Sequence, residues 1–165
     1  MKTRDAAIAD ASVIARIYNE GIDDRVATFE TRHRTADSVA QWLDGRHPVV
    51  VVEEDDGEVI AFAATSTYRP RDCYAGIAEF SVYAARAVRG RGAGRMAMDA
   101  LFAAARAAGF WKLVSRVFVE NTASRGLLLS VGFREVGVYE RHARLDGIWR
   151  DVVIVEKLLG SGLVD

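Results

Sequence analysis

The chain has 165 residues, of which half are hydrophobic and 27% are charged, and its 22 basic and 23 acidic side chains leave a net charge of −1. This length and balance are typical of a single globular domain, here residues 1–165, and exclude a disordered chain. The near-neutral total argues against a nucleic-acid-binding surface.

The N-terminal part of the chain predicts one strand followed by two helices. Residues 1–7 can form a short strand. The helical repeat of residues 10–21 begins at an aspartate and ends at a glycine, which are common residues at those two positions. Residues 25–32 are expected to form an irregular link. A second helix over residues 35–45 would begin at a threonine and again end at a glycine.

The middle of the chain predicts three strands. Residues 49–52 and 59–67 are apolar, β-branched runs on either side of an Asp-Gly pair, which favours a hairpin. After a loop, residues 75–84 predict a further strand. Side chains alternate between the faces of a strand, so Glu79 and Phe80 are expected to face opposite sides.

The C-terminal part predicts two more helices and three more strands, which are residues 96–108, 112–119, 121–132, 133–139 and 149–157. The order β-α-α-β-β-β-α-β-α-β-β implies a mixed α/β fold, with a central mixed sheet of seven strands and four helices distributed over both faces. Four aromatic residues are assigned to the core of this fold, namely Tyr18, Trp42, Trp111 and Phe133.

Several functional classes have no support in the residue types. The only cysteine, Cys73, excludes an intrachain disulfide framework, and His33, His47 and His142 lack the spacing of metal ligands, so no metal site is expected. No stretch approaches the ~20 apolar residues of a membrane span. The first residues do not have the apolar core of a signal peptide, which predicts a cytoplasmic protein.

Residues 84–95, the Arg/Gly segment, are the most informative part of the chain. They contain four arginines, three glycines and no acid, and they lie between a predicted strand and a predicted helix. Glycines allow backbone N–H groups to converge, and the following helix presents unpaired N–H groups and the positive end of its dipole. The segment therefore predicts a site for a phosphate-bearing ligand, whereas the simpler alternative is a glycine-rich turn with a solvated basic rim.

The segment fits one of two common nucleotide-binding patterns. Residues 92–97 fit the dinucleotide fingerprint G-x-G-x-x-[GA], with Glu120 near the position of the expected acid. However, two mononucleotide-binding halves and a substrate site would hardly fit in this length, and the order of elements is wrong for repeated βαβ units. The signature of a P-loop, GxxxxGK[ST], is absent from the sequence.

Read from Arg89 to Gly94, the same segment matches the pattern [QR]-x-x-G-x-[GA], and here the sequence resembles the GCN5-related N-acetyltransferases (GNAT). Residues 121–124, the Gly132-Phe133 pair and the order of elements extend this resemblance over nearly the whole chain. Four stretches look like the phosphinothricin and methionine-sulfoximine acetyltransferases: residues 17–19, 28–31, 78–83 and 147–152. Residues 68–76 narrow the likeness to the arsinothricin N-acetyltransferases.

The resemblance implies that acetyl-CoA is the cosubstrate. Amides of the Arg/Gly segment would bind the pyrophosphate, which implies Arg89, Gly90, Arg91, Gly92, Ala93, Gly94 and Arg95. The edge of the fourth strand would pair with the pantetheine arm at Val82, Tyr83 and Ala84, and Asn121 would hold the far end of that arm. Which of Arg86, Arg89, Arg91 and Arg95 touch phosphate stays open.

Glu79 aligns with the general base proposed for this family. A carboxylate can take the proton that an ammonium acceptor must lose before it attacks a thioester. Partial burial of Glu79 would raise its pKa toward the useful range, and the alternative is a solvated strand glutamate. A backbone N–H near Val82 or Tyr83 could stabilise the oxyanion.

Many relatives place a tyrosine, a candidate acid for the leaving thiolate, at the position that Leu128 occupies here. Tyr83 or Tyr139 could replace it, or CoA could leave as the thiolate and take a proton from solvent. No residue is assigned to this role.

The acceptor implied by the resemblance is a glutamate-like toxic amino acid, namely arsinothricin, phosphinothricin or methionine sulfoximine. Arg69 and Arg71 suit its anionic groups, while Phe29 and Glu30 are candidates for an apolar wall and an ammonium partner. The sequence does not rank these acceptors. The expected enzyme is a homodimer that confers resistance. The alternatives are acetylation of another small amine, a CoA-binding domain without turnover, and a dinucleotide-dependent reductase.

Overall fold

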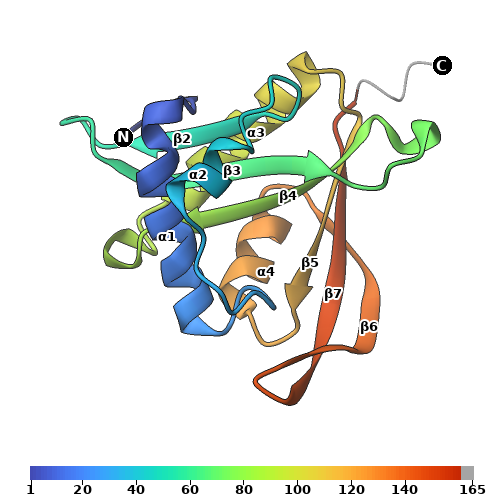
Figure 1. The fold of residues 1–165 in the computed structure, drawn as a ribbon. Coiled ribbons are helices and arrows are strands. Elements are labelled where there is room, and N and C mark those ends of the chain that lie inside the picture. Colours follow the sequence, from blue (N-terminus) through green and yellow to red (C-terminus); the bar gives the residue numbers. More distant parts are fainter. Residues whose placement is uncertain (161–165) are drawn as a thin grey trace.

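The computed structural model describes residues 1–160, so the last five residues of the expected domain, 161–165, lie outside the described residues. Seven strands form one sheet in the order β1-β2-β3-β4-β5-β7-β6 (Figure 1). The strands are β1 (Lys2–Asp5), β2 (Val49–Glu53), β3 (Val59–Thr67), β4 (Ile77–Ala84), β5 (Lys112–Phe118), β6 (Arg134–Leu145) and β7 (Ile148–Leu158). The helices are α1 (Ala11–Asp24), α2 (Ala36–Ala40), α3 (Ala93–Ala107) and α4 (Thr122–Ser130). The predicted mixed α/β fold and its element order are confirmed.

The helices cover both faces of the sheet because strand side chains alternate between two apolar clusters. On one face, α1 contributes Ile14, Ile17 and Ile22, which pack with Val51 and Phe62 of the sheet. The opposite face is covered by α3 and α4, whose buried residues Ala97, Met98, Leu101 and Leu128 pack with Val50, Val52 and Ala63. Within residues 1–160, no helix is long and apolar enough to cross a membrane.

The first helix is longer than the sequence predicts. It continues past Gly21 to Asp24, and Arg25 ends it in the left-handed conformation at φ 57°. Gly21 does not end the helix because it serves a packing role instead. A Cβ atom at Gly21 would lie only 2.5 Å from Cε1 of Tyr83, so only glycine lets this strand side chain approach the helix.

Two other helix boundaries differ from the prediction. The second helix spans only five residues, although Thr35 caps it as predicted by accepting a hydrogen bond from the Ser38 amide at 3.2 Å. The third helix begins at Ala93, three residues before the predicted start, so the last glycine of the Arg/Gly segment already lies within it.

Trp111, which the sequence assigns to the core, is 37% exposed, because its ring packs over Gly76 at the sheet surface.

The strands β4 and β5 form the only parallel pair among the described strands. Their backbone pairing lasts for three positions, from Ile77–Lys112 to Glu79–Val114, and then stops. Figure 1 shows the two strands diverging from this shared end. A parallel ladder that separates in the middle of a sheet leaves two facing strand edges without a partner, and the candidate site lies there.

Candidate active site

A cleft of about 1030 Å³ opens where β4 and β5 diverge. It is lined by the end of α1, the loop that follows α1, the separated halves of β4 and β5, and the first turns of α3 and α4. Of the residues predicted for the site, twelve line this cleft: Phe29, Glu30, Glu79, Val82, Tyr83, Ala84, Arg89, Gly90, Gly92, Gly94, Arg95 and Asn121. The structure therefore brings together most residues that the sequence proposed.

The Arg/Gly segment turns sharply into the first turn of α3. Gly90 and Gly92 have φ angles of +80° and +90°, a region that side chains disfavour, and Gly92 is the N-cap of the helix. Gly94 has a different role, because a Cβ there would lie 3.1 Å from Cδ2 of Leu127 on α4. Ala93 is buried in the core. The turn directs the positive end of α3 into the cleft, as an anion site requires.

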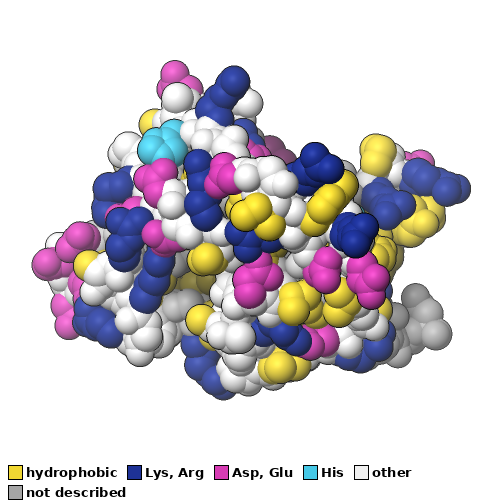
Figure 2. Space-filling view, turned by 90° about the horizontal axis from the view of Figure 1, so that it is seen from below, with side chains coloured by type: hydrophobic (Ala, Val, Ile, Leu, Met, Phe, Trp, Pro, Cys, Tyr) yellow, Lys and Arg dark blue, Asp and Glu magenta, His cyan; other side chains and the backbone are white. Residues whose placement is uncertain are grey.

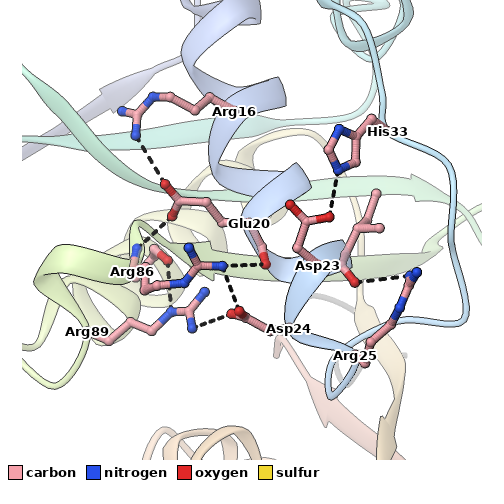
Figure 3. Close-up of polar contacts among 10 residues, drawn as sticks. Arg16, Glu20, Asp23, Asp24, Arg25, His33, Arg86 and Arg89 are labelled. Carbon is pink, nitrogen blue, oxygen red and sulfur yellow. Dashed lines mark hydrogen bonds and ion pairs between the residues drawn. The ribbon is translucent and has the colours of Figure 1, made fainter.

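The four arginines of this segment take different directions. Arg89 and Arg95 line the cleft, and Arg95 donates to Oγ of Ser130 at 3.3 Å. Arg86 points to Asp24 on α1, at 2.7 Å (Figure 3). Arg91 forms an ion pair with Glu54 at 2.8 Å, at the β2–β3 hairpin. All four arginines therefore contact a neighbouring element, since Arg89 also contacts Asp24, but only Arg89 and Arg95 line the cleft.

The free edge of β4 presents backbone groups to the cleft. The Phe80 carbonyl accepts a hydrogen bond at 2.9 Å from Oγ of Ser115 on β5, so the polar groups of Phe80 face the gap. Backbone groups alternate along a strand, and Val82 and Ala84 therefore face the same way. The Ala85 amide donates to the Ile60 carbonyl of β3 at 2.8 Å, so Tyr83, two residues earlier, also directs its backbone groups toward β3. Of the two backbone N–H groups considered for an oxyanion, only that of Val82 faces the gap.

Glu79 lies at the last paired position of β4, where the gap begins. Its side chain is 33% exposed and is therefore partly buried. Arg116 of β5 approaches it, with Nη2 at 3.3 Å from Oε1. The same guanidinium lies 3.4 Å from Nε2 of His142. Glu79 is therefore a solvent-accessible carboxylate beside a cation, at the mouth of the gap.

The loop after α1 forms the opposite wall. Asn19 fixes its far end through two hydrogen bonds with the backbone of Arg34, at 3.0 and 2.8 Å. The Phe29 ring packs edge-on against Phe118 of β5, with centroids 4.7 Å apart. Glu30 forms an ion pair with Arg34, so the predicted ammonium partner is already bound to a cation.

The residues considered as the acid that protonates the leaving thiolate have different surroundings. Leu128 is buried and lines the cleft, where it offers no proton. The Tyr83 ring packs between Phe62 and Tyr18, and burial raises the pKa of its phenol. Tyr139 is 52% exposed, stacks on His142 and does not line the cleft.

Asn121 lines the cleft, and its side chain also caps α4. Oδ1 accepts a hydrogen bond from the Ser124 amide at 3.2 Å. Since the oxygen serves this helix, the Nδ2 amide group is the part that can donate to a ligand.

Arg69 and Arg71 do not line the cleft of their own chain. They lie in the loop between β3 and β4, which projects from the sheet (Figure 1). Each guanidinium lies over a tyrosine of the same loop, Arg69 over Tyr68 at 5.1 Å and Arg71 over Tyr74 at 6.0 Å. Cys73 is an exposed free thiol in this loop.

Sequence reasoning missed four charged residues that line the cleft: Asp24, Arg34, Asp44 and Arg116. None belongs to a motif, and only the fold brings them to the site. Charge of both signs is interspersed over the face shown in Figure 2, without a continuous basic area.

Comparisons with known proteins agree on one family. Residues 14–133 match the Acetyltransferase (GNAT) family. The chain is 31% identical over 157 residues to an L-methionine sulfoximine/L-methionine sulfone acetyltransferase of Pseudomonas paraeruginosa, covering 93% of this chain and 91% of that protein. It is 29% identical to a phosphinothricin N-acetyltransferase of Streptomyces coelicolor, covering 96% of both chains.

Two solved structures extend these comparisons to the fold. One is yncA from Salmonella typhimurium with its cofactor acetyl-CoA, which is 30% identical, has a TM-score of 0.91 and covers 96% of this chain and 94% of its own. The other is a phosphinothricin acetyltransferase from Sinorhizobium meliloti in complex with AcCoA, which is 28% identical with a TM-score of 0.91 and covers 99% of this chain and 91% of its own. A sheet with one parallel pair also shows that the dinucleotide-reductase alternative is wrong.

Proposed function

Because the chain belongs to the GNAT family of acetyltransferases, we propose that it transfers the acetyl group of acetyl-CoA to the α-amino group of a glutamate-like toxic amino acid. Phosphinothricin, methionine sulfoximine and arsinothricin are the proposed acceptors, and the reaction would confer resistance to them. The names of the relatives support the first two, and the resemblance of residues 68–76 supports the third. We propose that residues 1–165 form one such domain.

The observation that carries this proposal is the position of Glu79 at the point where the β4–β5 ladder stops. Beyond it, the edge of β4 offers the backbone groups of Val82 and the N–H of Ala84 to an extended ligand, which could bind as an additional strand. At the end of that edge, the Arg/Gly segment and α3 offer N–H groups and two cleft-lining arginines to the phosphates. An extended thioester with a pyrophosphate at one end fits the spatial order of these groups along the cleft.

In the proposed reaction, the neutral amine attacks the thioester carbonyl after Glu79 accepts its proton, directly or through one water. A C–N bond forms, and the Val82 N–H donates to the oxyanion of the tetrahedral intermediate. The C–S bond then breaks while the nitrogen loses its second proton to solvent, and CoA leaves as the thiolate, which takes a proton from solvent because no acid is assigned. The products are the N-acetyl amino acid and CoA.

We propose that Phe29 and Glu30 form part of the acceptor wall, and that Arg69 and Arg71 bind the acceptor anions. Since neither arginine lines the cleft of its own chain, this role requires a second copy, which also agrees with the expected homodimer.

An exposed apolar surface supports such a dimer. Five hydrophobic residues of the β6–β7 hairpin are between 46% and 61% exposed: Val136, Val138, Tyr139, Ile148 and Trp149. Figure 2 shows hydrophobic side chains on the half of the molecule where these strands lie. β6 is also an edge strand of 12 residues, and long apolar edges are usually covered.

We also propose that the reaction takes place in the cytoplasm. The cytoplasm is a reducing compartment, which agrees with the free thiol of Cys73.

The experiment that tests this function follows free thiol released from acetyl-CoA over a panel of acceptors. The panel contains phosphinothricin, methionine sulfoximine, arsinothricin, glutamate and simple primary amines. Release confined to the toxic analogues supports the proposal. Release that is greatest with simple amines would assign another acceptor, and CoA binding without release would indicate a binding domain.

A further inference from the structure

We propose that Asp24, at the end of α1, is a positioning residue for acetyl-CoA that orients Arg89 of the Arg/Gly segment toward the phosphates. Asp24 lines the cleft beside Arg89, so an anion lies at the margin of a predicted anion site. This inference rests on the proposed cosubstrate, and its test separates the two.

The contacts of Asp24 join two elements that are more than 60 residues apart in sequence (Figure 3). Its Oδ1 accepts a hydrogen bond from Nη2 of Arg86 at 2.7 Å, and its Oδ2 accepts one from Nη1 of Arg89 at 2.5 Å. One turn earlier, Oε2 of Glu20 accepts from the backbone N–H of Arg86 at 2.7 Å. Both the backbone and the side chains of the Arg/Gly segment are therefore attached to α1.

The electrostatic position of Asp24 is unfavourable for the helix itself. A carboxylate in the last turn of a helix lies at the negative end of the helix dipole. Burial alone would raise the pKa of Asp24, but the guanidinium groups of Arg86 and Arg89 overcome this and lower it below the ordinary value. A residue that destabilises its own helix is usually retained because it has a function outside that helix.

The two guanidinium groups keep free donors after these contacts. Arg89 uses Nη1 for Asp24 and Nε for the Ala84 carbonyl, at 3.3 Å, which fixes the plane of its fork. In the described part of the chain, Nη2 of Arg89 donates to no protein group, and neither do Nε and Nη1 of Arg86. Pre-oriented arginines with free donors bind phosphate at a lower entropic cost than mobile ones. Because Arg86 does not itself line the cleft, the effect on the ligand passes through Arg89.

The test compares Asp24→Asn with Asp23→Asn, which removes the same charge one residue away. Asp23 contacts His33 at 2.7 Å and acts on Arg86 only through charge, without a hydrogen bond, so Asp23→Asn controls for the loss of charge alone. Calorimetry gives the Kd for CoA, and turnover is measured with acetyl-CoA and with S-acetylpantetheine, which carries no phosphates. The Arg89→Ala variant and the double variant Asp24→Asn/Arg89→Ala complete a double-mutant cycle.

We expect Asp24→Asn to raise the Kd for CoA roughly fivefold or more, with kcat nearly unchanged. Its activity with S-acetylpantetheine stays at the wild-type level, which also shows that the variant is folded. In the Arg89→Ala background, Asp24→Asn adds no further loss, and Asp23→Asn has no effect.

Three results would overturn the inference: an unchanged Kd, a lower Kd, which would make Asp24 a competitor of the phosphates, or additive losses in the cycle. If the wild-type protein does not bind CoA at all, the proposed function fails as well. That outcome is seen with the wild-type protein alone, whereas the three results above are seen only when the variants are compared with it.

Discussion

Glu79 on β4 is paired with Val114 of β5, and Arg116, two residues further along β5 where the two strands separate, places Nη2 3.3 Å from Oε1 of Glu79. The pair belongs to no motif, and it exists because the parallel ladder ends at this position. An α-amino acid carries its ammonium and its carboxylate on the same carbon atom, Cα, so a carboxylate beside a guanidinium suits both charges of the proposed acceptor.

Replacing Glu79 by Gln tests the proposed base. The amide keeps the size of the side chain and its contact with Arg116, but it cannot accept the proton of the attacking amine. We expect kcat to fall by roughly 100-fold or more, while the Kd for CoA changes by less than about twofold. Steady-state kinetics and calorimetry measure the two quantities, and undiminished turnover would remove Glu79 from the reaction.

Subunit mixing tests the proposed role of Arg69 and Arg71. The double variant Arg69→Ala/Arg71→Ala should raise the KM for the acceptor far more than the KM for acetyl-CoA, because neither arginine lies near the Arg/Gly segment. Mixing it with Glu79→Gln should restore about a quarter of the wild-type activity, since half of the mixed dimers would be heterodimers with one complete site. A protein that is monomeric by light scattering, or dimers that exchange subunits without recovery, would contradict this arrangement.

Two glycine-to-alanine variants test the approach of Tyr83 to α1. Gly21→Ala places a Cβ 2.5 Å from the Tyr83 ring, and we expect a loss of about 1–3 kcal/mol in the free energy of unfolding. Gly126→Ala in α4 meets nothing within 4 Å and should raise that free energy by about 0.5–1 kcal/mol. Urea denaturation measures both, and equal effects at the two sites would contradict the packing argument.

The Arg4–Asp10 ion pair predicts a pH-dependent contribution to stability. Two hydrogen bonds from the Arg4 guanidinium, at 2.7 and 3.0 Å, lower the pKa of the buried Asp10 below its ordinary value. A carboxylate with a lowered pKa stabilises the fold fully above its unfolded pKa of about 3.9, and this contribution is lost as the pH falls through the folded pKa.

Asp10→Asn should therefore lower the free energy of unfolding by about 2 kcal/mol at pH 7, and the difference from wild type should shrink below about pH 4. The control is Asp55→Asn, whose carboxylate is 96% exposed and contacts only the N-terminus, so its effect should be within about 0.5 kcal/mol. A difference between Asp10→Asn and wild type that does not depend on pH would contradict the linkage.

Local chemistry made most of the fold predictable. Hydrogen bonds and backbone angles at Gly57, Thr35 and Asn121 fix element ends locally, and these residues lie where the sequence suggests. Gly21 was misread because its reason is tertiary, namely the ring of a strand 62 residues later. The same distinction holds at the site. The Arg/Gly segment is visible as a motif, whereas Asp24, Arg34 and Arg116 reach the cleft only through packing.

The central claim is N-acetylation of a glutamate-like toxic amino acid by acetyl-CoA, and the most direct measurement combines thiol release with the mass of the product. With phosphinothricin, we predict one free thiol for each N-acetylphosphinothricin formed, none with acceptor already acetylated at nitrogen, and almost none with the Glu79→Gln variant. A protein that binds CoA but releases no thiol with phosphinothricin, methionine sulfoximine or arsinothricin would contradict this account.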